Sequence, residues 1–215
     1  MNKAEIFNLI QSVKGYEKSL KHDSLEKSKK NVDKPFQKFE FLGDRVLGLV
    51  ISEYLIENFH KSPLDEISRR FIHLVNTNTL AKVFKYHDFN EIFKHQLDPK
   101  SNKNSVYADA LESLIGFIYI EKELEFTKHL ILQLWKEELD TLPQKDPKTF
   151  IQEYSQKINK VIPTYNVVEE SGIKHKPKFK ISLKINDLYV EGEGVSKQKA
   201  EIVAAKKMIK LIQSK

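Results

Sequence analysis

The spacing of the hydrophobic residues changes near residue 140, and this change constrains the fold of the chain more than any other feature. Before it, apolar residues recur every three or four positions, as on one face of a helix. This pattern predicts four helices, at 39–59, about 65–83, 107–121 and 125–139. The polar stretches 22–35 and 97–105 are expected to be loops. The first part of the chain is therefore expected to be all-α.

Beyond residue 146 the pattern becomes mixed. Phe179–Ile185 alternates strictly between apolar residues and Lys or Ser, which predicts a half-buried strand. The other expected elements are a helix at 148–157, a strand at 164–168, a strand at 188–191 and a last helix capped by Ser196. An Asn186–Asp187 turn is expected to join Phe179–Ile185 to the strand at 188–191. The order is α-β-β-β-α, typical of a small α+β domain. We therefore expect domains at 1–139 and 146–215, joined by a proline-containing linker at 140–145.

The net charge of +6 is confined to this second part. Residues 146–215 hold 14 basic and 8 acidic residues, whereas the residues before them hold 22 of each. A basic module beside a neutral one indicates binding of a polyanion, although a basic solvated surface without a ligand gives the same count.

Composition excludes several classes of protein. The chain has no cysteine, which excludes disulfide scaffolds, thiolate metal sites and cysteine nucleophiles. No apolar run approaches the ~18 residues of a membrane span, and the first residues lack the apolar core of a secretion signal. We expect a cytoplasmic protein that does not bind membranes.

Two pairs of carboxylates lie among apolar residues of predicted helices. Glu40 and Asp44 are four positions apart, and Asp109 and Glu112 are three apart, so each pair shares one face of its helix. Carboxylates next to a core need a partner to stay ionised. If the two helices face each other, oxygen ligands converge and favour Mg²⁺, with Mn²⁺ as a substitute. Alternatively, each pair only complements the positive end of its helix dipole.

These residues carry a resemblance to the ribonuclease III family. The segments FEFLGDRVL at 39–47 and ADALESLIG at 108–116 resemble its two acidic signatures, and HDS at 22–24 and NTLA at 78–81 match in place. The resemblance covers nearly the whole chain and implies an all-α ribonuclease III endonuclease domain. It implies a metal centre of Glu40, Asp44, Asp109 and Glu112, with catalytic roles for Asp44 and Glu112. Two acidic positions of the family differ here, because Gln37 and Leu64 occupy them.

The C-terminal order resembles a double-stranded RNA-binding domain. Its first helix would present Thr149 and Gln152 to RNA, and the loop GIKHKPKF at 172–179 would present His175. Lys197 and Lys199 open the last helix, where the dipole is already positive. That placement disfavours the helix unless an anion such as a phosphate binds there.

The resemblance implies a Mg²⁺-dependent endoribonuclease specific for double-stranded RNA and not DNA. It would leave 5′-phosphate and 3′-hydroxyl ends and process ribosomal, messenger and transfer RNA precursors. It would act as a homodimer, for which the apolar 46–59 face with Phe39 and Phe41 is a candidate interface, although a place in the ordinary core is favoured for any one of these residues. The alternatives are a non-catalytic RNA-binding protein that retains the nuclease fold, and a small-nucleotide phosphohydrolase, which leaves the basic module without a role.

Overall fold

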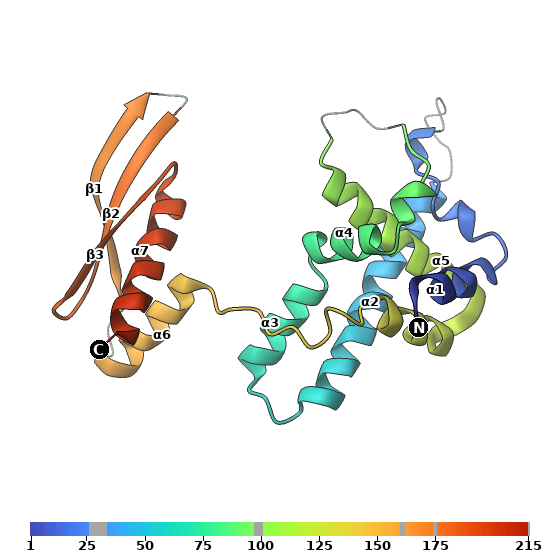
Figure 1. The fold of residues 1–215 in the computed structure, drawn as a ribbon, viewed down its shortest axis with the longest axis horizontal. Helices are drawn as coiled ribbons and strands as arrows, with labels where there is room; N and C mark the ends of the chain where they lie inside the picture. The colour runs from blue at the N-terminus through green and yellow to red at the C-terminus, as the bar shows by residue number, and fades with distance from the viewer. Residues whose placement is uncertain (26–33, 97–100, 160–161, 174–175, 215) are drawn as a thin grey trace. The chain divides into compact units, whose positions relative to one another are not determined.

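A computed structural model describes residues 1–25, 34–96, 101–159, 162–173 and 176–214. The chain divides into two compact units, Met1–Pro143 and Gln144–Lys215, and the division falls within the expected linker. Figure 1 draws both units, and each is described here by itself. None of the helices in the described ranges has an apolar stretch with which it could cross a lipid bilayer.

The described part of the first unit is built from helices, as predicted. The helices are α1 (Lys3–Gln11), α2 (Pro35–Phe59), α3 (Leu64–Leu74), α4 (Thr77–Tyr86) and α5 (Lys103–Leu134), with short 3₁₀ turns η1 (Tyr16–Lys18), η2 (Asp23–Leu25) and η3 (Phe89–Glu91). The long helices α2 and α5 lie against each other, and α4 packs on α5.

The predicted helix at 65–83 is wrong, because the chain breaks into α3 and α4. The side chain of Asn76 accepts hydrogen bonds from the N–H groups of Asn78 and Thr79 at 2.9 and 3.0 Å, which caps a new helix. The predicted interruption between 121 and 125 is confirmed, since Glu123 has a φ of 62° and kinks α5. Helices α2 and α5 begin four residues earlier than predicted, with Pro35 in the first turn of α2.

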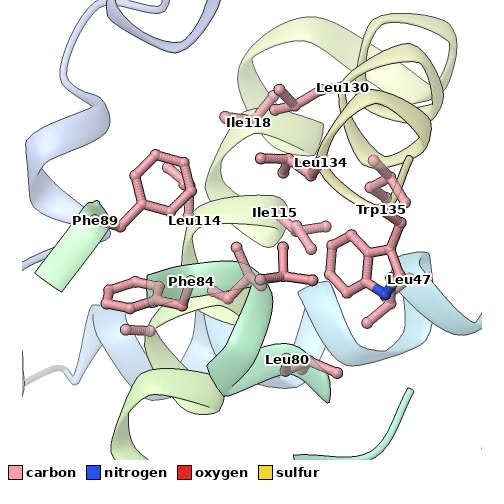
Figure 2. Packing of buried hydrophobic residues seen from close by; sticks show 14 of the residues in the cluster. Leu47, Leu80, Phe84, Phe89, Leu114, Ile115, Ile118, Leu130, Leu134 and Trp135 are labelled. Carbon is pink, nitrogen blue, oxygen red and sulfur yellow. The ribbon is translucent and has the colours of Figure 1, made fainter. Parts of the chain in front are cut away.

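The core of the first unit lies between α2, α4 and α5. Figure 2 shows Phe84 and Leu80 of α4 facing Leu114 and Ile115 of α5. Trp135, which follows α5, is fully buried and donates a hydrogen bond from Nε1 to the Leu74 carbonyl at 2.9 Å. The end of the unit is thereby fixed against α3.

The second unit has the predicted α-β-β-β-α order. It consists of α6 (Pro147–Asn159), β1 (Thr164–Ile173), β2 (Lys176–Ile185), β3 (Leu188–Gly194) and α7 (Lys197–Gln213). The strands form one antiparallel sheet in the order β1-β2-β3 (Figure 1). Ile151 of α6, Leu183 of β2 and Met208 of α7 are buried together in its core. The turn at Asn186, which has a φ of 52°, is where the sequence predicts it.

Candidate nuclease centre and RNA-binding surface

Helices α2 and α5 cross with their backbones in direct contact at two glycines. A Cβ added to Gly43 would lie 1.8 Å from the carbonyl oxygen of Glu112, and one added to Gly116 would lie 2.0 Å from that of Phe39. The ring of Phe39 packs edge-on against Phe117 beside this contact, at 5.3 Å between centroids. Only glycine allows this approach, so the two residues fix the crossing point and register of the helices.

This crossing brings three of the four predicted carboxylates together. Glu40 lies about one turn before Gly43, and Asp109 and Glu112 lie in the turns before Gly116. Ligand oxygens of the three carboxylates lie within 4.8 Å of one another, and all three residues are half-buried. All three carboxylates lie beyond the first turns of α2 and α5, so a favourable interaction with the helix dipole does not explain why acidic residues occupy these positions.

Burial raises the pKa values of all three carboxylates, and the charges of acidic neighbours add to the effect for Glu40 and Glu112. Burial and then the charges of Asp109 and Glu40 raise the pKa of Glu112 to about 7, against the opposing effect of Arg45. Burial and the charges of Asp109 and Asp23 raise the pKa of Glu40, and burial raises that of Asp109. Such a cluster needs a proton or a cation, and its oxygen-only donors fit a hard divalent ion.

Asp44, the fourth predicted ligand, is not among the three residues whose oxygens meet. It lies one turn beyond Glu40 on α2, with its side chain 44% exposed, and forms an ion pair with the adjacent Arg45. The Arg45 guanidinium also lies over the ring of Phe41, 5.1 Å from its centroid. The expected convergence of four carboxylates is therefore observed for three, and a role for Asp44 stays a prediction.

Asp23 is a further acidic residue near the centre, and its place there was not predicted from the sequence. Its charge contributes to the raised pKa of Glu40. The turn that carries it is fixed by hydrogen bonds from the Ser24 N–H to His22 Nδ1 and from the Gln96 N–H to Ser24 Oγ, both 3.0 Å. The match of residues 22–24 to a family motif was the available signal, because Asp23 is the acidic residue within it.

The predicted RNA-binding residues lie on exposed surfaces of both helices of the second unit. Thr149 and Gln152 are exposed one turn apart on α6, and Lys197 and Lys199 are exposed in the first turn of α7. Ser196 Oγ accepts a hydrogen bond from the Lys199 N–H at 3.2 Å, which confirms the predicted cap. His175 lies outside the described residues.

Glycines also fix α7 against the sheet. A Cβ on Gly192 would lie 2.2 Å from the Ala200 carbonyl oxygen, and one on Gly194 would lie 2.6 Å from the Ala200 nitrogen. This close packing sets the position of the first turn of α7 relative to β3. It therefore determines where the two predicted phosphate-binding lysines stand.

Several lysines of this unit already have acidic partners. Lys197 lies 3.5 Å from Glu170 of β1 and 5.6 Å from the ring centroid of Phe179. On the sheet, Lys178 pairs with Glu193 at 2.8 Å and Lys180 with Glu191 at 2.7 Å. The lysines of this unit are therefore not all equally available to bind an anion.

Comparison with known proteins identifies both units. The family profile of the ribonuclease III domain matches residues 37–123, and that of the double-stranded RNA binding motif matches residues 147–212. The chain is 40% identical over 195 residues to "Ribonuclease 3" of Pelagibacter ubique, covering 87% of this chain and 85% of that protein. It is 38% identical over 188 residues to "Ribonuclease 3" of Shewanella denitrificans, covering 82% of each.

A solved structure agrees with the first unit. The nuclease domain of ribonuclease III from Campylobacter jejuni matches with a TM-score of 0.51 and 32% identity, over 60% of this chain and 95% of that domain. Its description refers to a region involved in dimer formation. Sequence profiles, relatives and fold all agree, and the chain belongs to the ribonuclease III family as a bacterial-type endoribonuclease that acts on double-stranded RNA.

Proposed function

We propose that this protein hydrolyses phosphodiester bonds of double-stranded RNA with Mg²⁺ held by Glu40, Asp109 and Glu112. The single observation that supports the metal centre is the meeting of three half-buried carboxylates from two helices within 4.8 Å. A protein that kept this fold only as a scaffold would gain nothing from such a cluster, because the mutual repulsion of its charges disfavours the folded state. The non-catalytic alternative is therefore disfavoured.

The three carboxylates would hold the ion, and Mn²⁺ fits the same oxygen donors. A divalent ion at this place supplies a Lewis acid for the phosphate and a means to ionise water near neutral pH. Asp44 lies one turn beyond Glu40 on α2, outside the group of three, with its side chain 44% exposed. We assign it to positioning a water or to binding the metal as a fourth ligand, as its match to the family signature implies.

The second unit would hold the duplex. Double-stranded RNA presents phosphates and 2′-hydroxyl groups at regular spacing and is recognised by shape. Thr149 and Gln152 would contact one minor groove, His175 the next, and Lys197 and Lys199 the phosphates between them. Recognition through 2′-hydroxyls would exclude duplex DNA.

A homodimer would place two such centres on one duplex, each cutting one strand. Exposed apolar side chains on α2 and α3 support it: Phe41 is 66% exposed, Leu64 75% and Ile72 63%. Ile56 and Ile72 also line a shallow groove between these helices. Phe39, by contrast, packs on Phe117 and belongs to the core. Apolar patches of this kind mark association surfaces.

The products would carry 5′-phosphate and 3′-hydroxyl ends with a short 3′ overhang. Precursors of ribosomal, messenger and transfer RNA contain the required duplexes, and bacteria make them in the cytoplasm. We therefore assign the protein to processing of these RNAs in that compartment.

The test is cleavage of a perfect RNA duplex with Mg²⁺ or with EDTA. We expect short products with Mg²⁺ and an intact but bound duplex with EDTA. Glu112→Gln should lower the rate by about a thousandfold and spare binding, since removing a metal ligand costs several kcal/mol in the transition state. Glu53→Gln is the matched control, because Glu53 lies on α2 but pairs with Lys128 outside the cluster. Cleavage that survives both EDTA and Glu112→Gln would exclude the proposed centre.

A further inference from the structure

The end of the first unit, from Glu138 to Pro143, is held by two neighbouring arginines of α3. Arg70 Nη1 donates to the carbonyl oxygens of Asp140 and Thr141 at 3.3 and 3.4 Å. Arg69 Nη1 donates to the carbonyl oxygen of Pro143 at 3.3 Å. Three backbone carbonyls at the start of the linker are therefore bound to one helix.

Arg70 is fixed before it reaches the linker. Its side chain is only 8% exposed, its Nε donates to Glu66 Oε1 at 3.1 Å, and its guanidinium lies 3.9 Å from the ring centroid of Phe59. Ser62 Oγ in turn donates to the same Glu66 oxygen at 2.9 Å. A planar guanidinium held in this way presents its remaining donors in one direction, with little entropy left to lose.

Other helices hold the same stretch. Glu138 is buried and pairs with Lys82 of α4 at 2.5 Å, and its other carboxylate oxygen lies 3.7 Å from Nε2 of His73 on α3. Asp140 lies beside Tyr54 of α2. Burial, and then the charge of Asp140, raise the pKa of the Tyr54 hydroxyl. Residues 138–143 are therefore part of the first unit in their packing as well as in their position.

The connection between the units is consequently short. Beyond Pro143 only Gln144 and Lys145 precede Asp146, whose Oδ1 accepts from the N–H groups of Lys148 and Thr149 at the start of α6. Lys145 itself pairs with Glu153 of α6. Without the arginines, the segment that joins the two units would grow from Gln144 and Lys145 to the five residues 141–145, because Asp140 still lies beside Tyr54. Its extended reach would then rise from about 7 Å to about 18 Å.

We propose that Arg69 and Arg70 are positioning residues that set the length of the segment joining the nuclease unit to the RNA-binding unit, and thereby the place at which a bound duplex is cut. This inference depends on the proposed cleavage of duplex RNA. Effective concentration falls with roughly the 3/2 power of linker length, so release of the linker lowers it about fourfold at the nuclease centre. The longer reach also admits more than one cleavage position for a given RNA-binding register.

The experiment uses the full-length protein and a duplex with one defined end. Of the three bound carbonyls, Arg69→Ala releases only that of Pro143, and it also removes the ion pair of Arg69 with Asp65. The triple variant Glu66→Gln, Arg69→Ala, Arg70→Met releases all three carbonyls, and its Glu66→Gln change avoids an unpaired carboxylate beside the new apolar side chain at position 70. Inserting Gly-Ser-Gly after Gln144 lengthens the joining segment by the same three residues with the arginines intact. Lys128→Ala is the control, since it removes an ion pair with Glu53 away from the linker.

We expect KM to rise about fourfold in the triple variant and in the insertion variant, with kcat within about twofold and a broader set of product lengths. Arg69→Ala should shift both readouts in the same direction by less, and duplex binding in EDTA should not change. If the insertion and the triple variant cut at the wild-type positions with wild-type KM, the proposal is wrong while the nuclease assignment stands. A triple variant that loses kcat and stability, beside an insertion variant that behaves as wild type, would also overturn it. If the wild-type protein cuts no duplex, the proposed function itself fails.

Discussion

The two units use glycine in the same way but place opposite charges next to the contact. In the first unit, Gly43 and Gly116 let α2 and α5 touch, and the neighbouring carboxylates are half-buried and close together. In the second unit, Gly192 and Gly194 let β3 and α7 touch, and the neighbouring Lys197 is exposed beside Glu170. The first arrangement stores charge repulsion that a bound cation relieves, whereas the second leaves its charges screened by water.

The pKa values of acidic residues express the same difference. Burial and like charges raise the pKa of Glu112 to about 7. On the sheet, hydrogen bonds from Lys180 and Lys178 lower the pKa values of Glu191 and Glu193 respectively. The carboxylates of the first unit are therefore prepared to exchange a proton for a metal, and those of the sheet remain ionised as partners for lysines.

Among the substitutions that test the glycine contacts of the two units, the largest effect is expected from adding a methyl group at the helix crossing. In Gly116→Ala the new Cβ meets the Phe39 carbonyl oxygen, which is backbone and cannot rotate away. We expect a loss of about 3 kcal/mol in unfolding free energy and a fall in cleavage rate of about a hundredfold, because displaced carboxylates no longer share an ion. Thermal unfolding and single-turnover cleavage measure the two effects.

The matched substitution in the other unit separates the roles of the two contacts. Gly192→Ala should destabilise the second unit and weaken duplex binding, yet leave cleavage at low salt largely intact, since the carboxylates are untouched. If Gly192→Ala abolishes cleavage at low salt, or Gly116→Ala leaves it unchanged, the comparison between the units is wrong.

A second effect is a dependence of metal stabilisation on pH. The pKa of Glu112 is about 7 in the folded, metal-free protein and 4.5 in the unfolded chain. Between these values the folded state retains a proton that the unfolded state releases, so stability falls as pH rises, by up to about 3 kcal/mol in total. Mg²⁺ should therefore raise the melting temperature more at pH 8 than at pH 5. In Glu112→Gln most of this difference should vanish; an equal Mg²⁺ shift at both pH values in the wild type would contradict the assignment.

The parts of the fold that the sequence predicted well are those with a local cause. The α-β-β-β-α order follows from alternation and from the Ser196 cap, both of which act over a few residues. β1 extends to Ile173, beyond its predicted end at 168. The prediction ended too early because a bulge between Val167 and Glu169 interrupts the two-residue alternation of the strand. The split between α3 and α4 was missed because apolar spacing continues across the capping Asn76.

The site was predictable only as far as single helices determine it. Helical spacing placed Asp109 and Glu112 on one face, but which carboxylates meet depends on the crossing point of two helices. That point is set by the contact of Gly43 with the Glu112 backbone, a tertiary feature that leaves Asp44 outside the group. The nearness of Asp23 and the binding of the linker by Arg70 are likewise contacts between distant segments.

A third prediction concerns the salt dependence of RNA binding. Replacing Lys197 or Lys199 by Gln should reduce the slope of log K against log salt by about 0.9 for each phosphate that the variant no longer neutralises. Binding is measured in EDTA so that the duplex stays intact. Lys180→Gln is the control, because Lys180 is paired with Glu191 on the sheet, outside the segment 172–179, and its replacement should leave the slope unchanged. A slope that changes equally in all three variants would indicate a diffuse charge effect instead of a phosphate site.

The smallest effect should come from Glu170, and it probes the screening of charges in the second unit directly. Glu170 and Lys197 are both more than half exposed and 3.5 Å apart, so their mutual attraction is weak and a phosphate competes with it. In Glu170→Gln this competition disappears and the duplex should bind about twofold more tightly at low salt. The gain should vanish at high salt, where exposed charges are screened.

In the Lys197→Gln background the same substitution should have a smaller effect, because the lysine whose charge it releases is gone. Weaker binding in Glu170→Gln would mean that the carboxylate orients Lys197 for the phosphate, which would make this ion pair part of the binding surface.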